Sequence, residues 1–338
     1  MANDKKLRFL AVSASLLLFR YAMAKLISTS RPSETPEILA STETYLLKCP
    51  SGNIIHVEFD GLEHGQPLVL LHGLNSNSLQ WFYQRKFFLD KYKLIFVDLP
   101  GHGKSAMPRS IAISSIAGDL AYILDYLRIE DPIIYGHSMG AMVAMEYCIN
   151  HPEAKTRGMV LQHTTHTNVL YTNSLSKILA PLERSFIIPF LKFSLKNHRL
   201  IWLLSLGNYL NGLSVLFYRF LYFTGRQTSA QFEFKSRLAV LTSPKTVALA
   251  LLELIQLNLT DRIKSIKVPS LIIAAYSDRL TTVEANEYIH SQIKESQLRY
   301  IKTGHFSLFE NSFEVNRAVH NFIENLRPVR ENIVEDAG

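Results

Sequence analysis

The fold of this 338-residue chain is decided by one stretch, Ile133-Ile134-Tyr135-Gly136-His137-Ser138-Met139-Gly140-Ala141. The apolar residues before Gly136 predict a buried β-strand, and helix-forming residues begin just after Ser138. The turn between them must be sharp, so the residue at its tip takes a strained backbone conformation. Gly136 and Gly140, which flank Ser138 at two residues' distance, avoid steric clashes in such a turn. The turn would present the Ser138 hydroxyl at the carboxyl end of the strand, where open α/β sheets bind ligands.

Strands and helices are expected to alternate on both sides of this stretch. The candidate strands are Tyr45–Lys48, Ile54–Phe59, Pro67–Leu71, Lys93–Asp98, Pro132–Tyr135, Gly158–Gln162, Ser270–Ala275 and Gln297–Ile301. Helical patterns lie between them, notably over Ser114–Leu127 and Met139–Asn150. The last four candidate strands are continuous apolar runs, as expected of parallel strands buried on both faces. We therefore predict an α/β fold with a mostly parallel sheet flanked by helices.

The alternation stops between residues 165 and 245, where the pattern is helical and rich in aromatic residues. Residues 165–240 hold nine Lys or Arg residues and two acidic residues, whereas the remaining 27 basic residues of the chain are balanced by 27 acidic ones. A localised positive charge of this kind indicates a surface that faces something anionic. We predict that this stretch is a helical lid inserted into the sheet domain.

The N-terminus has the pattern of a secretory signal peptide. Lys5, Lys6 and Arg8 precede an apolar run over residues 9–19, and a small-residue site at 22–24 follows. Eleven apolar residues are too few to span a bilayer, and a longer helix would enclose Arg20. Three interpretations stay open: a cleaved signal peptide, an uncleaved anchor or helix on the membrane surface, and a helix docked on the domain. The first two predict an exported or membrane-associated protein rather than a cytoplasmic one.

These patterns divide the chain into six parts. The N-terminal signal or anchor covers residues 1–27, and a linker rich in Ser, Thr, Pro and Glu covers 28–44. The first part of the core covers 45–164, the lid 165–245 and the second part of the core 246–328, and a tail follows over 329–338. The hydrophobic share of 47% is enough for a sizeable buried core.

Four motifs occur in an order that resembles the α/β-hydrolase superfamily over about residues 50–325. The first is a His-Gly loop after the third candidate strand, His72-Gly73-Leu74-Asn75, and the second is a D-x-x-G-x-G-x-S loop at Asp98–Ser105. The third is the serine turn at Gly136–Gly140, and the fourth is a late histidine loop, Gly304-His305-Phe306. The resemblance implies the α/β-hydrolase fold and a serine nucleophile, Ser138. It also implies that the backbone N–H groups of Leu74 and Met139 form an oxyanion hole. His72 and Asp98 are structural residues in this family, so we expect them to shape their loops.

By the same resemblance, the base that a serine nucleophile needs follows a late strand, and the acid follows the sixth or the seventh strand. His305 follows the last candidate strand and is the expected base. The strand at Gly158–Gln162 is followed by no carboxylate, whereas Ser270–Ala275 is followed by Asp278, the expected acid. The chain order Ser138, Asp278, His305 is the order of this fold.

A serine at the turn points to acyl transfer and excludes the family branches that use aspartate as the nucleophile. We predict hydrolysis of carboxylic esters, lipophilic ones in view of the aromatic lid, with no metal and no organic cofactor. Membrane contact through the N-terminus and the basic lid is a further expectation. Alternatives on the same fold are a C–C bond hydrolase, a perhydrolase, an acyltransferase and a non-catalytic binding protein. Long aliphatic runs among the lid cations argue against binding of nucleic acid.

Overall fold

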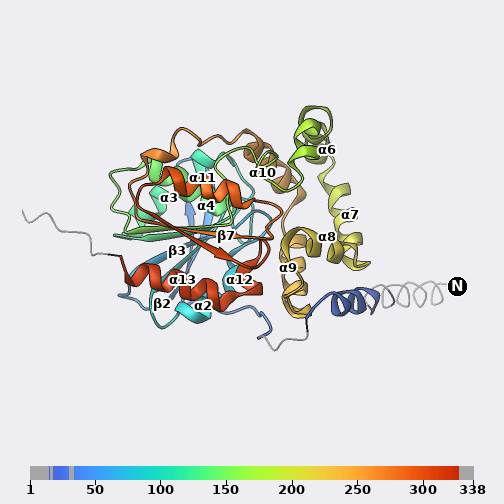
Figure 1. Cartoon of the computed structure of the whole chain (residues 1–338), viewed down its shortest axis with the longest axis horizontal. Helices are drawn as coiled ribbons and strands as arrows, with labels where there is room; N and C mark the ends of the chain where they lie inside the picture. The colour runs from blue at the N-terminus through green and yellow to red at the C-terminus, as the bar shows by residue number, and fades with distance from the viewer. Residues whose placement is uncertain (1–14, 16–17, 30–33, 327–338) are drawn as a thin grey trace, which may run out of the picture.

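The computed structural model describes residues 15, 18–29 and 34–326 and is built around one sheet of eight strands (Figure 1). The strand order is β1-β2-β4-β3-β5-β6-β7-β8. The strands span Glu43–Lys48, Ile54–Gly61, Pro67–Leu71, Lys93–Asp98, Ile133–His137, Gly158–Gln162, Ser270–Ala275 and Ser296–Ile301, numbered β1 to β8 in this order. β1 and β2 pair antiparallel, and the pairs from β4 to β8 are parallel. The prediction of a mostly parallel sheet is confirmed.

One detail of that prediction is wrong. The last strand, β8, was expected to be buried on both faces, but five of its six residues are exposed or only partly buried. β8 lies at the edge of the sheet and pairs with β7 alone. An edge strand has no second neighbour to cover it, so Arg299 and Tyr300 face solvent.

Helices cover both faces of the sheet (Figure 1). Alternate residues of β3 point to opposite faces, since side chains alternate along a strand. Val69 and Leu71 pack in the core formed with α3 (Ile113–Tyr126) and α4 (Met139–Asn150). Leu68 and Leu70 pack in the core that includes α2 (Phe82–Phe88) and α13 (Ser312–Glu324). α11 (Val283–Gln292) and α12 (Ser307–Glu310) complete the helices near the carboxyl ends of the late strands.

The segment between β6 and β7, residues 163–269, carries the remaining long helices and is called the inserted segment below. Its helices α5 to α10 span Ser176–Leu179, Ile188–Lys196, His198–Leu210, Leu213–Tyr222, Ser229–Leu241 and Pro244–Gln256. They lie beside one end of the sheet in Figure 1. The expected lid boundary at residue 246 falls within α10, which packs on α6.

Among the described helices, no single one is long and apolar enough to cross a membrane. Two bent pairs, α7 with α8 and α9 with α10, reach the required length and composition only together, across bends of 91° and 90°.

The described part of the N-terminus is docked on the inserted segment. Residues 1–14 and 16–17, with most of the expected signal or anchor, lie outside the described residues, and residues 18–26 are helical. Arg20 is 3% exposed, and its guanidinium donates to Glu233 (Nε–Oε2 3.0 Å) and to the carbonyl oxygen of Tyr209. It also lies 3.7 Å from the centroid of the Tyr209 ring. The docked-helix interpretation accounts for a buried arginine, because the ion pair and the carbonyl satisfy its charge.

Candidate active site

The turn between β5 and α4 holds Ser138 in a conformation that non-glycine residues rarely adopt. Its φ is 54° and its ψ is −117°. Such a backbone costs about 1–3 kcal/mol and persists only where the surroundings enforce it. Ser138 N–H donates to the carbonyl oxygen of Gln162 at 2.9 Å, and Thr164 Oγ1 donates to the Ser138 carbonyl oxygen at 3.0 Å. Neighbouring strand ends therefore hold the turn in place.

The two glycines of the turn are required by close packing. A Cβ on Gly140 would lie 2.1 Å from the carbonyl oxygen of Leu71 in β3, and a Cβ on Gly136 would lie 2.4 Å from the backbone of Ala141. Both contacts are with backbone atoms that cannot rotate away. The sequence argument for small residues around Ser138 thus has a direct steric cause.

His305 and Asp278 are brought together at the same edge of the sheet. Asp278 follows β7, and His305 follows β8. His305 Nδ1 and Asp278 Oδ2 are 2.8 Å apart, and both side chains are buried. Because the carboxylate occupies Nδ1, Nε2 is the nitrogen of His305 left for another partner.

Asp278 is fully provided with hydrogen-bond donors. Its Oδ1 accepts from the backbone N–H groups of Leu280 (2.8 Å) and Thr281 (3.0 Å), and its Oδ2 also accepts from Thr281 Oγ1 at 2.7 Å. Burial alone would raise the pKa of this carboxyl, but the charge and hydrogen bond of His305, with His163 nearby, hold the pKa below its usual value. Asp278 is therefore an ionised group that can stabilise a protonated His305.

His137, next to Ser138 in the turn, has a role that the sequence did not reveal. Its Nε2 lies 3.0 Å from the carbonyl oxygen of His305. A carbonyl only accepts, so Nε2 carries a proton. Burial places the pKa of His137 well below its usual value, which agrees with a neutral ring. His137 thus ties the serine turn to the loop of His305, and the two rings lie 5.0 Å apart.

The other two histidines near the strand ends are also engaged. His163 is buried, with Nε2 2.5 Å from Ser307 Oγ, and burial lowers its pKa to about 3. The ring of His166 stacks on Tyr288 at 4.2 Å.

The loop after β3 passes directly beside the serine turn. A Cβ on Gly73 would lie 3.2 Å from Ser138 Cβ, so the loop approaches the serine closely. Leu74 is partly buried, and Asn75 after it has a φ of 58°. Met139 is the first residue of α4, so its N–H has no partner within the helix. The two backbone N–H groups expected to bind an oxyanion therefore belong to segments that meet at Ser138.

His72 and Asp98 lie at the base of these loops and hold backbone groups. His72 Nε2 accepts from the N–H of Leu99 at 2.9 Å, and its Nδ1 lies 2.8 Å from the Gly73 carbonyl oxygen. Asp98 accepts from the N–H groups of Ser78 (2.8 Å) and Lys104 (2.9 Å). Both side chains thereby shape their loops.

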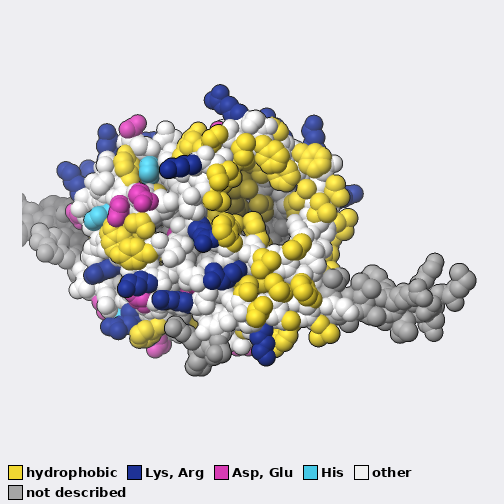
Figure 2. Space-filling view, turned by 45° about the vertical axis from the view of Figure 1, so that its right-hand side comes forward, with side chains coloured by type: hydrophobic (Ala, Val, Ile, Leu, Met, Phe, Trp, Pro, Cys, Tyr) yellow, Lys and Arg dark blue, Asp and Glu magenta, His cyan; other side chains and the backbone are white. Residues whose placement is uncertain are grey.

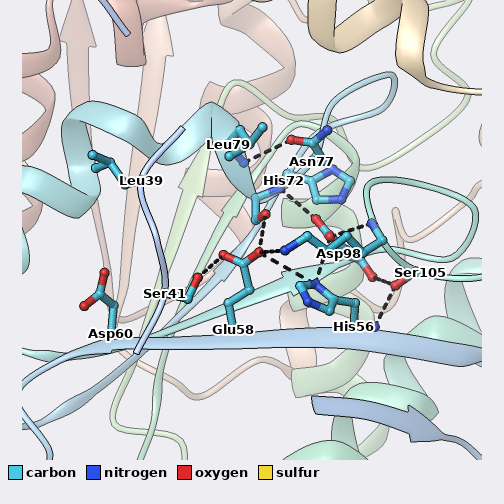
Figure 3. Close-up of polar contacts among 12 residues, drawn as sticks. Leu39, Ser41, His56, Glu58, Asp60, His72, Asn77, Leu79, Asp98 and Ser105 are labelled. Atoms are coloured by element: carbon cyan, nitrogen blue, oxygen red, sulfur yellow. Dashed lines mark hydrogen bonds and ion pairs between the residues drawn. The ribbon is translucent and has the colours of Figure 1, made fainter. Parts of the chain in front are cut away.

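Asp98 also belongs to a buried cluster with His56 and Glu58 whose ligand-type atoms lie within 4.8 Å of one another (Figure 3). His56 Nδ1 lies 3.1 Å from Asp98 Oδ2, and Arg85 donates to Glu58 at 2.7 Å. The Arg85 guanidinium is only 4% exposed and supplies the positive charge that a metal ion would bring. The cluster is therefore a set of hydrogen bonds and ion pairs that connects β2 with β4.

One charged residue near the site was not singled out by the sequence. Lys235, in α9, is fully buried and donates to the carbonyl oxygen of Asn75 at 2.9 Å. Seven of the nine cations counted between residues 165 and 240 are exposed, at Lys177, Arg184, Lys192, Lys196, Arg199, Arg226 and Arg237. α9 buries residues on most of its faces, so no local periodicity separates Lys235 from those cations.

Comparison with known proteins supports the same fold. A family model described as alpha/beta hydrolase fold matches residues 66–312. The chain is similar to two esterase structures: one from Exiguobacterium antarcticum (22% identity, TM-score 0.68, covering 82% of this chain and 98% of that one) and RhEst1 from Rhodococcus sp. ECU1013 (22%, 0.70, 84% and 99%).

Curated relatives include enzymes of several kinds. 3-Oxoadipate enol-lactonase 1 from Acinetobacter baylyi is 21% identical over 82% of this chain and 95% of its own length. The sn-1-specific diacylglycerol lipase ABHD11 from Danio rerio is 29% identical, but over 39% of this chain and 42% of its own length. The chain likewise spans 36% of epoxide hydrolase 1 from Caenorhabditis elegans. Because the family model covers residues 66–312, from the start of β3 to beyond His305, the chain belongs to the alpha/beta hydrolase fold family.

Proposed function

We propose that this protein is a serine hydrolase that cleaves carboxylic esters. The observation that carries the proposal is the hydrogen-bonded pair of His305 and Asp278, which His137 connects to the strained turn that presents Ser138. A hydroxyl needs a base, and a base of this kind needs an acid that orients it and stabilises its charged form. The names of the similar esterases, lipase and enol-lactonase support the same class of bond.

In the proposed reaction Ser138 Oγ attacks the ester carbonyl carbon while its proton passes to His305 Nε2. The backbone N–H groups of Leu74 and Met139 donate to the oxyanion that forms. The intermediate collapses to an acyl-enzyme, and the alcohol leaves with the proton from His305. Water then attacks the acyl carbon, gives its proton to His305, and the acid is released as Ser138 regains its hydrogen.

We propose further that the acyl group is lipophilic, because a large apolar cavity opens beside the site. A hollow of about 470 Å³ lies among the helices of the inserted segment and reaches Asn75, the residue after Leu74. Its walls are mostly apolar and include Phe190, Trp202, Leu213, Phe217, Val247 and Leu251. Figure 2 shows hydrophobic side chains around a hollow on this face. A cavity of this size and lining suits an aliphatic chain, and the inserted segment would act as the lid over it.

The full-length protein is expected to hydrolyse p-nitrophenyl esters, with kcat/KM rising from the acetate to the octanoate. Val247→Trp would fill part of the cavity, so it should lower kcat/KM for the octanoate about 10-fold while leaving the acetate nearly unchanged. Lys245→Trp, at an exposed position of the same helix, is the matched control. A folded wild-type protein that hydrolyses no ester of the series contradicts the proposed function. Equal losses for both esters in Val247→Trp contradict the proposal that this cavity binds the acyl chain, but they leave the proposed ester hydrolysis unaffected.

We also propose that α6 to α8 and the docked N-terminal helix contact a membrane surface. Large apolar side chains are exposed on α6 to α8 at Phe190, Phe193, Leu200, Trp202, Leu203, Leu204, Leu213, Leu216, Phe217 and Phe220, and on the docked N-terminal helix at Leu18, Phe19, Tyr21 and Leu26. Exposed apolar patches of this extent mark interaction sites. Exposed cations such as Lys192 and Lys196 lie among them, as expected for anionic lipid headgroups.

Binding to vesicles should therefore depend on lipid charge. We expect tighter binding to vesicles with anionic phosphatidylglycerol than to phosphatidylcholine alone, by about 1 kcal/mol for each cation at the surface. Trp202 reports the contact, because Trp81 is buried and the chain has two tryptophans. Lys192→Glu with Lys196→Glu should weaken binding to anionic vesicles. The same changes at Lys264 and Lys267, exposed between α10 and β7 and away from α6 in the sequence, should not. Equal binding to both vesicle types would refute the charge-dependent contact.

A further inference from the structure

Lys235 is a buried charge that bridges two loops of the candidate active site. It lies in α9 of the inserted segment and is fully buried. Its ammonium donates to the carbonyl oxygen of Asn75 at 2.9 Å, in the loop that follows Leu74. It also lies 5.0 Å from the ring centroids of both Tyr222 and Phe306, and Phe306 directly follows His305.

Among the described residues, Lys235 contacts no carboxylate. Burial lowers the pKa values of the described residues His72, His102 and His137, and the nearby positive charge of Lys235 lowers each of them further. Tyr222, which faces it from α8, has its pKa raised by burial and is therefore neutral. The Lys235 ammonium thus has a single carbonyl and two aromatic rings where a buried charge ordinarily has a counterion.

A buried lysine without a counterion destabilises the native state, whereas an unbranched apolar side chain would fill the same space without that cost. Stability therefore does not explain its presence. The loop that it contacts is the one expected to bind the negative charge that develops in the reaction. Asn75 is held in a left-handed conformation, and its N–H donates to His102 Nε2 at 3.3 Å. Its backbone is thus fixed on both sides.

We propose that Lys235 is a positioning residue of the oxyanion loop, which fixes the Asn75 carbonyl and places a positive charge beside the oxyanion that the Leu74 and Met139 N–H groups bind. This inference rests on the proposed function. It makes α9 a contributor to catalysis, since a helix of the inserted segment supplies charge to a site built on the sheet. Favourable charge in a water-excluded site stabilises the transition state more than the ground state.

The charge of Lys235 should make this contribution depend on pH. Burial lowers the pKa of Lys235 to about 7, so the ammonium is present below that pH and is lost above it. The neutral amine still donates to the Asn75 carbonyl, so only the electrostatic part disappears. In the unfolded chain the pKa is about 10.4. Between these values the unfolded chain binds a proton that the native chain does not, so this group makes the native state more stable as pH rises.

The test compares the wild-type protein with Lys235→Met and Lys235→Gln in hydrolysis of p-nitrophenyl butyrate at pH 6 and pH 9. At pH 6, Lys235→Met should lower kcat about 10- to 100-fold with little change in KM. The ratio of wild-type to variant kcat should shrink at pH 9, where the wild-type charge is gone. Lys235→Gln keeps a hydrogen-bond donor without the charge and should show the same shrinking ratio. Arg237→Met removes an exposed charge from the same helix and should change neither kcat at pH 6 nor the ratio of kcat values between the two pH values.

Thermal unfolding at pH 6 separates this role from a structural one. Lys235→Met should unfold at a higher temperature than the wild type while turning over more slowly, a combination that damage to the fold does not produce. A ratio of kcat values that is the same at both pH values overturns the electrostatic role. A rise in KM without loss of kcat overturns the proposal in favour of binding an anionic group of the substrate. If the wild type has no esterase activity at all, the proposed function fails first.

Discussion

Replacing Ser138 by alanine is expected to lower ester hydrolysis about 10⁵-fold. The reaction requires a nucleophilic oxygen at the tip of the turn between β5 and α4, and alanine removes only that oxygen. The backbone keeps its φ of 54°, because alanine has the same Cβ and the same strain. The hydrogen bonds from the Ser138 N–H and to its carbonyl oxygen remain as well.

Two measurements check that this loss is chemical. The melting temperature of Ser138→Ala should match that of the wild type, and labelling by a fluorophosphonate probe should disappear. Ser291→Ala, at an exposed serine of α11, serves as the matched control and should keep full turnover and labelling. Turnover that survives in Ser138→Ala would show that another residue is the nucleophile.

Replacing Asp278 by asparagine is expected to lower kcat about 10⁴-fold. The N–H groups of Leu280 and Thr281 donate to Oδ1, so the amide oxygen of asparagine must take that position. The amide nitrogen then faces His305 Nδ1 in place of Oδ2. Since an amide N–H donates, His305 must accept at Nδ1 and carry its proton on Nε2. That tautomer cannot take the proton of Ser138.

The control for this change is Asp261→Asn, which alters an exposed carboxylate between α10 and β7 and should have no effect on kcat. The Asp278→Asn protein should still fold, because the backbone N–H groups of Leu280 and Thr281 still donate to the amide oxygen. The Thr281 hydroxyl can accept from the amide nitrogen instead of donating to Oδ2. His305→Ala combined with Asp278→Asn should cost little more than His305→Ala alone, since both act through one base. Additive losses would contradict a shared role.

Much of the fold could be predicted because it is encoded by residues close together in the chain. Four of the eight strands have the bounds expected from apolar runs, and helix α4 begins and ends where its pattern does. The turn at Ser138 is recognisable because sterics at Gly136 and Gly140 restrict which residues can stand there. The meeting of His305 and Asp278 follows from the rule that carboxyl ends of parallel strands share one edge.

The edge strand β8 shows where such patterns stop being sufficient. β8 is not a continuous apolar run, because Gln297 and Arg299 interrupt it, and a strand at the edge of a sheet can leave such residues accessible. β8 is last in the sheet order, so most of its residues stay accessible. The N-terminal helix gives a second case, since Arg20 is buried by Glu233 and Tyr209, residues about two hundred positions away.

The sequence by itself thus determined the sheet, the serine turn and the order of Ser138, Asp278 and His305, because each depends on local sterics or on the topology of parallel strands. Only the tertiary structure decided which cations of the inserted segment face solvent and which reach the site. Lys235 and Asn75 are 160 residues apart, and a helix buried on most faces leaves no period that could mark the lysine. Its role depends on where α9 packs, which is set by contacts between distant segments.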